Sequence, residues 1–475
     1  MNRTLKLRLV LALLLAVTLA GAAQAQFPDT PAAQQFAAWL TAFNSGDRAT
    51  LQAFLQKNDP SHADRIDNQM GFRRQTGGFE FKKAEESTPT KFTGIVKERA
   101  SDQFARFTME VESTEPHHIT QLGLGAIPTP AEFALPRMNQ ADALAALRLE
   151  IEKTVAADHF AGSVIVAKNG ELIFSGAYGL ADREKKIPNK LDTKFRIGSM
   201  NKMFTAVSVM QLVQAGKIKL SDPLGKYLTD YPNQDVATKV TIHHLLTHTG
   251  GTGDFFGPEF DAHRLELRTL QDYVKLYGKR GLEFEPGNRW EYSNYGFLLL
   301  GVLVEKISGQ GYYDYVAEHV FKPAGMTSTA SLAEDQNVPD RSIGYTKSGG
   351  GEAWKPNTDT LPYRGTSAGG GYSTVGDLLR FANALQNHKL LDAEHTDLLT
   401  TGKVDAPNRG KYAYGFFDRS NGGIRCFGHG GGAPGMNGDL QICPQSGYVI
   451  AVLANLDPPA AQRVSEFIAN RLPDK

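Results

Sequence analysis

The strongest constraint on the fold is a β-hairpin signal near the start of the longer, C-terminal part of the chain. Two strand-like runs, Ser163–Lys168 and Glu171–Ala177, flank the dipeptide Asn169-Gly170. Asn-Gly is the preferred sequence of a two-residue type I′ turn, so the two runs are expected to pair as antiparallel strands. A further strand is predicted at Tyr448–Leu456, after a long region of helical pattern. Strands at both ends of a helical region predict an α+β fold in which these ends meet in one antiparallel sheet flanked by helices.

Helices are predicted on either side of this sheet from apolar residues that recur at intervals of three and four. The segment Ala141–Ala157 carries Leu144, Leu147 and Ile151 on one face, and the segment Pro459–Leu472 has a similar stripe.

Residues 27–124 form a separate predicted unit. One helix is indicated by the apolar stripe around Trp39, and Asp47 is placed to cap a second helix that runs through Leu55. Strand-like runs follow around residues 79–86, 91–98, 104–112 and 118–124. Helices followed by a meander of antiparallel strands resemble the NTF2-like or SnoaL-like cone fold, so we expect a small α+β domain here. The Pro-containing segment 125–137 is expected to link it to a larger domain at 138–475.

The first 25 residues have the pattern of a secretory signal peptide. Arg3, Lys6 and Arg8 precede an apolar run from Leu9 to Leu19, and Ala23-Gln24-Ala25 is a typical cleavage site. We expect cleavage near Ala25 and export to the periplasm or the cell exterior. The apolar run is short for a bilayer, and no later segment reaches the roughly 18 apolar residues that a membrane helix needs.

The charge balance gives no indication of a polyanionic partner. The chain has 51 basic and 51 acidic residues, and loss of the leader leaves a net charge near −3. Without a strong positive field, nucleic acid is not expected as a partner.

The chain has two cysteines, Cys426 and Cys443. They flank a Gly/Pro-rich loop that resembles a hairpin connection, and an oxidising compartment would allow one disulfide between them. The alternative is a pair of buried free thiols. Their spacing does not match a metal site.

The sharpest chemical feature is Ser199-Met-Asn-Lys202. If a helix begins near Ser199, the two side chains project from the same face. A neighbouring lysine with a depressed pKa can then assist deprotonation of the serine hydroxyl. The spacing alone is common, and an N-cap serine beside a solvated lysine would produce it equally well.

Two later motifs make this interpretation specific. Tyr292-Ser293-Asn294 follows about 90 residues on, and His429-Gly430-Gly431-Gly432 comes late in the chain. The order S-x-x-K, Y-x-N, [KH]-x-G is that of the penicillin-recognising serine hydrolases. Residues 138–475 therefore resemble the class C β-lactamase-related hydrolases, which include serine esterases, D-aminopeptidases and D,D-carboxypeptidases. The resemblance implies an antiparallel sheet flanked by helices, with a helical subdomain.

The resemblance also implies roles for matched positions. Ser199 would be the nucleophile that forms an acyl-enzyme, Lys202 would assist its deprotonation, and Tyr292 would protonate the leaving group. Asn294 would orient Lys202 and the substrate. Substrate-binding roles would fall to His429, Gly430 and Gly431, and the backbone N–H groups of Ser199 and Gly432 would form the oxyanion hole.

The middle residue of the third motif departs from the usual Thr or Ser. Gly430 lacks the hydroxyl that binds a substrate carboxylate, so we expect ester turnover to exceed β-lactam turnover. The expected function is an exported serine hydrolase that acts on a small-molecule or peptide acyl substrate without a cofactor or metal. D,D-carboxypeptidase or β-lactamase activity is one alternative. A catalytically silent binding protein with the same fold is another.

Other motif matches carry less structural context. Gly365-Thr-Ser367-Ala-Gly369 matches the G-x-S-x-G motif of α/β-hydrolases, but it lacks an apolar strand before it and an amphipathic helix after it. His244 and His248 have a spacing that can bind zinc, but no third ligand is evident. We therefore favour the S-x-x-K interpretation.

Overall fold

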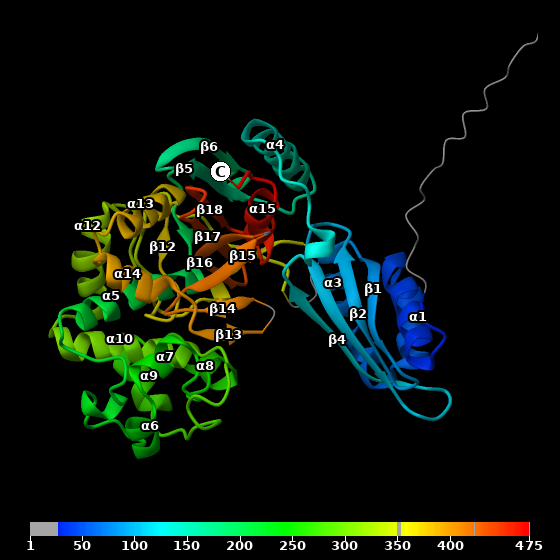
Figure 1. Cartoon of the computed structure of the whole chain (residues 1–475), viewed down its shortest axis with the longest axis horizontal. Coiled ribbons are helices and arrows are strands. Elements are labelled where there is room, and N and C mark those ends of the chain that lie inside the picture. The colour runs from blue at the N-terminus through cyan, green and yellow to red at the C-terminus, as the bar shows by residue number, and fades with distance from the viewer. Residues whose placement is uncertain (1–26, 349–352, 408, 422, 475) are drawn as a thin grey trace, which may run out of the picture.

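The computed structural model describes residues 27–348, 353–407, 409–421 and 423–474, so the predicted signal peptide lies outside the described residues. The N-terminal region, blue to cyan in Figure 1, packs helices against one face of a four-stranded antiparallel sheet. Its helices are α1 (Pro31–Ser45), α2 (Arg48–Asn58) and α3 (Ile66–Thr76). Its strands, in sheet order, are β1 (Phe79–Ser87), β2 (Lys91–Glu98), β3 (Phe104–Val111) and β4 (Ile119–Ile127).

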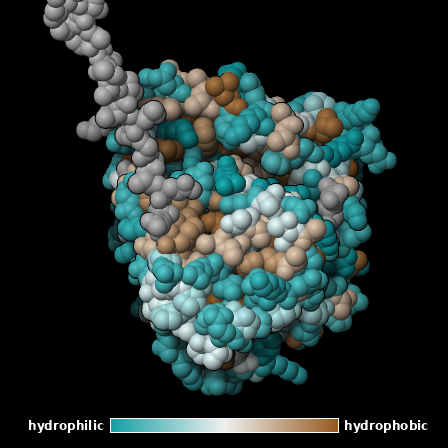
Figure 2. All heavy atoms as spheres, turned by 90° about the vertical axis from the view of Figure 1, so that its right-hand side faces the viewer, coloured by the Kyte–Doolittle hydropathy of each residue, from teal (hydrophilic) through white to brown (hydrophobic). Residues whose placement is uncertain are grey.

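Capping and aromatic packing explain why this region folds locally. Asp47 accepts the N–H of Thr50 and starts α2, in agreement with the sequence pattern. The space between α1 and the sheet is filled by aromatic rings, including Phe36 and Phe107, which stack with their centres 3.7 Å apart. Figure 2 looks onto the side of the molecule that carries this region and shows a largely hydrophilic face with scattered apolar residues.

Two features of the N-terminal region differ from the sequence prediction. The pattern does not predict α3, because this helix is mostly polar and buries only Ile66 and Thr76. Strand β4 continues to Ile127, beyond the predicted boundary at 124, because Ile127 pairs with Phe104 and packs in the same apolar cluster. The first residues of the predicted linker therefore belong to the sheet.

An eight-stranded antiparallel sheet forms the centre of the C-terminal region. In sheet order its strands are β13 (Val404–Ala406), β14 (Gly410–Tyr412), β15 (Phe417–Asn421), β16 (Ile424–Ala433), β17 (Met436–Cys443), β18 (Tyr448–Ala454), β5 (Gly162–Lys168) and β6 (Glu171–Tyr178). The late strand β18 pairs with the early strand β5, so the two ends of this region meet in one sheet as the sequence predicts. Asn169 and Gly170 both have positive φ in the β5–β6 turn, as a type I′ turn requires.

Helices cover both faces of this sheet. On one face, α4 (Gln140–Ala156) and α15 (Ala460–Ala469) share an apolar cluster with β5 and β18. On the other face, α5 (Asn201–Gln214), α10 (Asn294–Ser308) and α13 (Val375–Gln386) belong to the largest core cluster. No helix among the described residues is both long enough and apolar enough to cross a membrane.

The rest of the helical region is formed by shorter elements, yellow-green to green in much of Figure 1. The helices are α6 (Gln234–Lys239), α7 (Ile242–Leu246), α8 (Pro258–His263), α9 (Leu270–Tyr277), α11 (Tyr312–Val316), α12 (Lys322–Ala324) and α14 (Ala393–Thr400). The short strand pairs are β7 (Leu180–Asp182) with β8 (Ile187–Pro188), β9 (Phe195–Arg196) with β12 (Tyr372–Ser373), and β10 (Tyr345–Thr346) with β11 (Lys355–Pro356).

Candidate active site

Ser199 and Lys202 lie where a 3₁₀ turn enters helix α5. Ser199 is in the turn Gly198–Met200, and Lys202 is in the first turn of the helix. The Nζ of Lys202 is 3.4 Å from the Oγ of Ser199. Gly198 has a φ of +53°, a left-handed conformation that glycine adopts at little cost. The turn therefore presents the serine hydroxyl directly to the lysine amine.

The amine of Lys202 is buried and has two fixed acceptors. Its Nζ lies 2.7 Å from Oδ1 of Asn294 and also contacts the carbonyl oxygen of Ala368. Burial lowers the pKa of Lys202 to about 7, although the negative charge of Asp254 opposes part of this shift. A large fraction of the amine is therefore unprotonated near neutral pH.

Asp254 fixes the orientation of Asn294. The Nδ2 of Asn294 donates to Oδ2 of Asp254 at 2.7 Å, which leaves Oδ1 of Asn294 facing Lys202. Ser293 caps helix α10 by accepting the N–H of Gly296, and this cap places Asn294 at the first residue of the helix. Asp254 cannot be recognised from the sequence, since it lies in an irregular loop at no fixed spacing from the three motifs.

The side chain of Tyr292 is half-buried and lies beside both Ser199 and Lys202. Its hydroxyl interacts with the side chain of Ser199. The Nζ of Lys202 is 4.7 Å from the centre of the tyrosine ring. Burial raises the pKa of Tyr292 well above its ordinary value, and the contact with Ser199 opposes part of this rise. Tyr292 is therefore protonated at neutral pH.

His248 holds the backbone on both sides of Tyr292. Its carbonyl accepts the N–H of Glu291 at 2.9 Å, and its Nδ1 accepts the N–H of Ser293 at 3.0 Å. Its ring also packs on the ring of Tyr292, with centres 4.3 Å apart. Burial lowers the pKa of His248 well below its ordinary value, so the ring is neutral. The spacing of His248 from His244 along the sequence does not predict these contacts.

Strand β16 brings the third motif against the turn that carries Ser199. A Cβ on Gly431 would lie 1.9 Å from the carbonyl oxygen of Ile197, so only glycine allows this approach. A Cβ on Gly198 would lie 3.1 Å from the backbone nitrogen of Gly432. The Gly432 N–H is therefore next to the residue that precedes Ser199.

His429 is a neutral, buried residue. Its Nε2 lies 3.1 Å from the hydroxyl of Tyr412, and its Nδ1 contacts the carbonyl oxygen of Gly430. Burial lowers the pKa of His429 well below its ordinary value, and the positive charge of Lys202 adds to the effect. The third motif therefore contributes no cation from this position.

The structure corrects the interpretation of Gly430. A Cβ on Gly430 would lie 3.0 Å from Nε2 of Gln462 and 3.3 Å from Oδ1 of Asp439. Successive residues of a strand face opposite sides. Gly431 faces Ile197 on one side of β16, and Gly430 faces Gln462 of α15 on the other. A hydroxyl at position 430 would point toward α15, so its absence does not remove a group from the space beside Ser199.

The competing motif matches do not form sites of their own. Ser367 is fully buried, and its hydroxyl donates to the carbonyl of Leu298. His244 caps α7 together with Thr241, whereas His248 contacts the Tyr292 segment. Within the described ranges, no group of three His, Cys, Asp or Glu side chains is placed to hold a metal ion.

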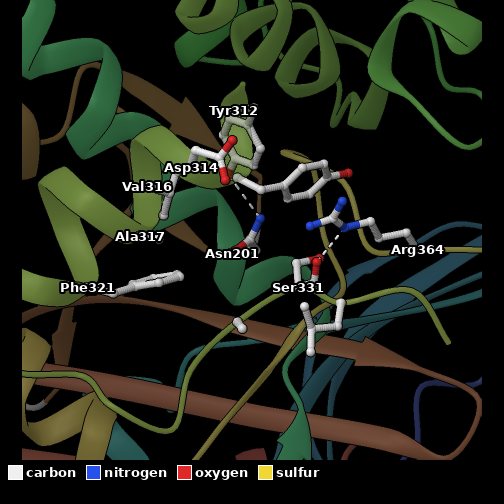
Figure 3. Close-up of a pocket in the computed structure, with 11 residues that line it drawn as sticks. Asn201, Tyr312, Asp314, Val316, Ala317, Phe321, Ser331 and Arg364 are labelled. Carbon is white, nitrogen blue, oxygen red and sulfur yellow. Dashed lines mark hydrogen bonds between the residues drawn. The ribbon is translucent and has the colours of Figure 1, made fainter. Parts of the chain in front are cut away.

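A small pocket lies behind the Ser199 turn, at the start of α5. Figure 3 shows it between Tyr312, Arg364 and Phe321. Its volume is about 160 Å³. Asn201 enters it from α5 and donates to the Thr366 carbonyl at 2.7 Å. The pocket is lined by neither Ser199 nor Lys202.

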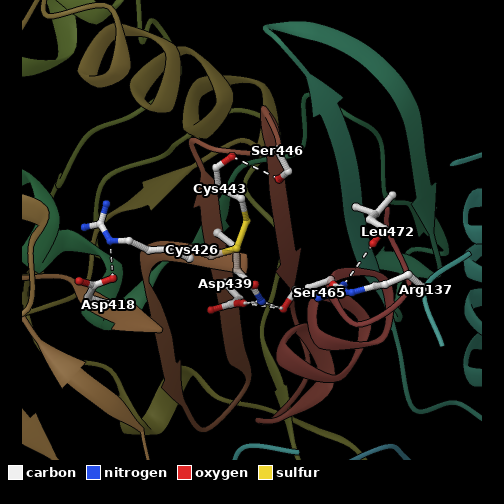
Figure 4. Close-up of a disulfide and its surroundings, with 11 residues drawn as sticks. Arg137, Asp418, Cys426, Asp439, Cys443, Ser446, Ser465 and Leu472 are labelled. Atoms are coloured by element: carbon white, nitrogen blue, oxygen red, sulfur yellow. Dashed lines mark hydrogen bonds and ion pairs between the residues drawn. A yellow bond between two sulfur atoms is a disulfide. The ribbon is translucent and has the colours of Figure 1, made fainter. Parts of the chain in front are cut away.

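Cys426 and Cys443 form a disulfide between strands β16 and β17 (Figure 4). It joins the β16 strand of the third motif to its neighbour, on the side where Asp439 contacts Ser465 of α15.

Comparison with known proteins assigns the family. Residues 148–474 match the family Beta-lactamase. The chain is 30% identical over 293 residues to penicillin-binding protein 4* of Bacillus subtilis (strain 168), an alignment that covers 58% of this chain and 64% of the relative, slightly less than two thirds of that protein.

Solved structures agree with this match. A penicillin-binding protein from Bacillus halodurans is 35% identical, with a TM-score of 0.60, and the match covers 66% of this chain and 97% of that one. The D-amino acid amidase from Ochrobactrum anthropi SV3, in complex with L-phenylalanine amide, is 25% identical, with a TM-score of 0.59, over 69% of this chain and 97% of that one. The α+β fold, the juxtaposed S-x-x-K, Y-x-N and H-x-G segments and these matches together show that the chain belongs to the beta-lactamase family of serine hydrolases.

Proposed function

We propose that this protein hydrolyses an acyl substrate through an acyl-enzyme on Ser199, with Lys202 as the general base. The observation that carries the proposal is the set of contacts around Nζ of Lys202. A neutral amine has two N–H groups and one lone pair, and the two N–H groups are taken by Asn294 and Ala368. The lone pair is left for the Ser199 hydroxyl, 3.4 Å away.

The reaction follows from these positions. Oγ of Ser199 attacks the acyl carbon as its proton passes to Lys202, and the resulting oxyanion accepts hydrogen bonds from the N–H groups of Ser199 and Gly432. Tyr292 donates its proton to the leaving group and regains one from Lys202. Water then attacks the acyl-enzyme by the reverse proton route, which releases the acid and restores Ser199.

Esters are the proposed substrate class. The neutral state of His429 supports this choice, because a cation at this position would attract the carboxylate that β-lactams and C-terminal D-alanine carry.

A carboxypeptidase-like activity is the second candidate, and the position of the positively charged Arg409 favours it. This residue lies between β13 and β14, 5.8 Å from the ring centre of Phe417, and its charge acts on Tyr292 and His429. Partial desolvation and the neighbouring charge of Arg419 lower the pKa of Arg409, although the residue is exposed, and none of the described carboxylates is among the groups that influence it. A substrate carboxylate could take that place.

The test begins with covalent labelling by a fluorophosphonate probe. Wild-type protein should be labelled and Ser199→Ala should not, and a wild type that stays unlabelled would argue for a silent binding protein. If labelling is lost in Ser367→Ala but kept in Ser199→Ala, the nucleophile is Ser367 of the G-x-S-x-G segment. A panel of a nitrophenyl ester, nitrocefin and a D-alanyl peptide then ranks the substrate classes. If Arg409→Gln lowers turnover of the D-alanyl peptide but not of the ester, this result supports the carboxypeptidase-like activity.

We also propose that the protein is exported and that residues 27–127, which include all of strand β4, fold as a domain of their own before the larger domain at 138–475. The sequence of residues 1–25 supports export, and the Cys426–Cys443 disulfide fits an oxidising compartment. Mass spectrometry of the purified protein from the native host should find a mature chain that begins at Gln26. A chain that retains its first 25 residues would contradict export by this route.

A further inference from the structure

Side chains of the N-terminal region contact helix α15 of the larger region and the loop that precedes this helix. Glu98 pairs with Arg463 at 2.6 Å, and Asp102 pairs with Arg471 at 2.7 Å. A third contact runs from Nε2 of Gln75 to the carbonyl oxygen of Pro458, at 2.9 Å. These contacts come from the end of α3 and the β2–β3 turn of the N-terminal sheet.

The two ion pairs are more enclosed than others on the same region. The Arg463 and Glu98 side chains are 18% and 11% exposed, whereas the Arg106 and Glu85 pair on the N-terminal sheet is 48% and 28% exposed. An exposed pair adds little to stability, but removal of one partner from an enclosed pair leaves an uncompensated charge. Removal of one partner from either ion pair with α15 should therefore destabilise this contact more than the same change in an exposed pair.

A buried carboxyl group lies at the same junction. Burial raises the pKa of Glu466, on α15, to about 7. The groups that act on it are Arg419 and Asp439 from the large sheet, Glu98 from the N-terminal region, and Arg463 from its own helix. Residues of the N-terminal region, the helix and the sheet thus share one electrostatic environment.

The loop before α15 supports the glycine strand from behind. A Cβ on Gly432 would lie 2.7 Å from Cγ of Pro458, so the proline ring packs directly on this glycine. Asn437 donates to the carbonyl of Gly431 at 2.8 Å and accepts the N–H of Ala461 at 2.6 Å. The segment that carries the proposed oxyanion donor thus rests on the residues that the N-terminal region holds.

We infer that the N-terminal region acts as a positioning element for the strand Gly430–Gly432, through Gln75, Glu98 and Asp102. By fixing Pro458 and α15 from outside, it limits the movement of the Gly432 N–H relative to Ser199. The catalytic consequence rests on the proposed function, but the effect on strand mobility does not. Small displacements at an oxyanion donor lower kcat strongly, since loss of the whole donor costs about 10²–10³ and a 1 Å misplacement can cost about 10².

Charge reversal with rescue tests the inference in the full-length protein. Glu98→Arg and Arg463→Glu are made singly and together, and the exposed pair Glu85→Arg with Arg106→Glu is the matched control. Hydrogen exchange of peptides that span residues 427–434 is measured beside kcat and KM for a nitrophenyl ester. We expect each single reversal at the junction to speed exchange in this strand and to lower kcat about tenfold, with KM changed less than about twofold. The double variant should restore both, and the control variants should match wild type.

Gln75→Leu is the second variant, because it removes only the hydrogen bond to Pro458 and leaves both ion pairs in place. Unchanged exchange at 427–434 in both single reversals and in Gln75→Leu would overturn the inference. Failure of the double variant to restore exchange would also overturn it, since a general loss of stability gives no rescue. A protein without hydrolase activity would still show the exchange pattern, so this result separates the inference from the proposed function.

Discussion

The pH dependence of the reaction is the most direct consequence of the buried amine of Lys202. At a pKa of about 7, roughly half of the amine is neutral at pH 7, whereas at its ordinary pKa of 10.5 only about one molecule in 3,000 would be. The ratio of kcat to KM for a neutral nitrophenyl ester should therefore rise with pH and level off above an apparent pKa near 7. His248 and His429 titrate at lower pH, because burial depresses the pKa of both.

Asp254→Asn is the perturbation that tests this assignment. Asp254 acts on Lys202 across the Asn294 amide, and its charge raises the pKa of the lysine. The two charges are separated by one amide group and two hydrogen bonds of 2.7 Å each. At an effective dielectric constant of about 20 to 40, a charge pair held apart in this way interacts by about 1–2 kcal/mol, or about one pKa unit. Removal of the charge should therefore move the acidic limb of the profile about one unit lower. Asparagine keeps an oxygen that can accept from Asn294, so the site geometry should survive.

The assay measures kcat/KM from pH 5 to 9 at constant ionic strength. Glu466 is the control, because its pKa is also about 7, and Glu466→Gln should leave the limb in place. A limb that stays at the same pH in Asp254→Asn, or that disappears in Glu466→Gln, would refute the assignment of this titration to Lys202.

Four further predictions concern three single residues and the disulfide. His248→Asn should keep kcat within about threefold of wild type, because asparagine tolerates the left-handed backbone at this position (φ +60°) and its Oδ1 can replace Nδ1 as the acceptor. His248→Leu lacks this acceptor and should lower kcat about tenfold or more, and steady-state kinetics distinguish the two variants. Gly431→Ala should lower the rate of fluorophosphonate labelling at least about tenfold, because the new Cβ would lie 1.9 Å from the carbonyl oxygen of Ile197. The far-UV circular dichroism spectrum should stay normal, and unchanged labelling would contradict the close approach of β16 to the Ser199 turn. The pKa of Glu466 is higher in the folded than in the unfolded protein, so this residue stabilises the fold fully below about pH 4.5. That stabilisation is lost as pH rises toward 7, by at most about 3 kcal/mol. Glu466→Gln should therefore raise Tm at pH 8 more than at pH 5, and an equal change at both pH values would contradict a raised pKa for this carboxyl group. Replacement of Cys426 and Cys443 by serine should lower the free energy of unfolding by about 3 kcal/mol in urea titrations, as expected for a cross-linked loop with a sequence separation of 17, and no difference would indicate that the native protein is reduced.

The sequence predicts those parts of the fold that depend on local pattern. The Asn169-Gly170 turn and the apolar stripes of α4 and α15 are local signals, and the structure follows them. Helix α3 escapes prediction because it has neither a side-chain cap at its N-terminus nor an apolar stripe of its own, and it buries only Ile66 and Thr76.

The candidate site divides in the same way. Ser199, Lys202, Tyr292 and Asn294 are visible as motifs, and the structure brings all four together. Asp254 and the carbonyl of Ala368 lie on irregular loops, where only the folded chain decides which groups meet. The direction of Gly430 is similarly a matter of strand register, which no spacing along the sequence reveals.

The place of β18 in the sheet bears on how the chain folds and how it fails. Lys168 and its partner Tyr448 are 280 residues apart, so the centre of the sheet forms only when nearly the whole region has been synthesised. Until then, β17 and β5 each expose an unpaired edge whose residues are almost all buried in the folded protein, and such edges readily pair with other chains. A chain that stops before Tyr448 should therefore aggregate through these two edges rather than fold into a smaller version of the enzyme.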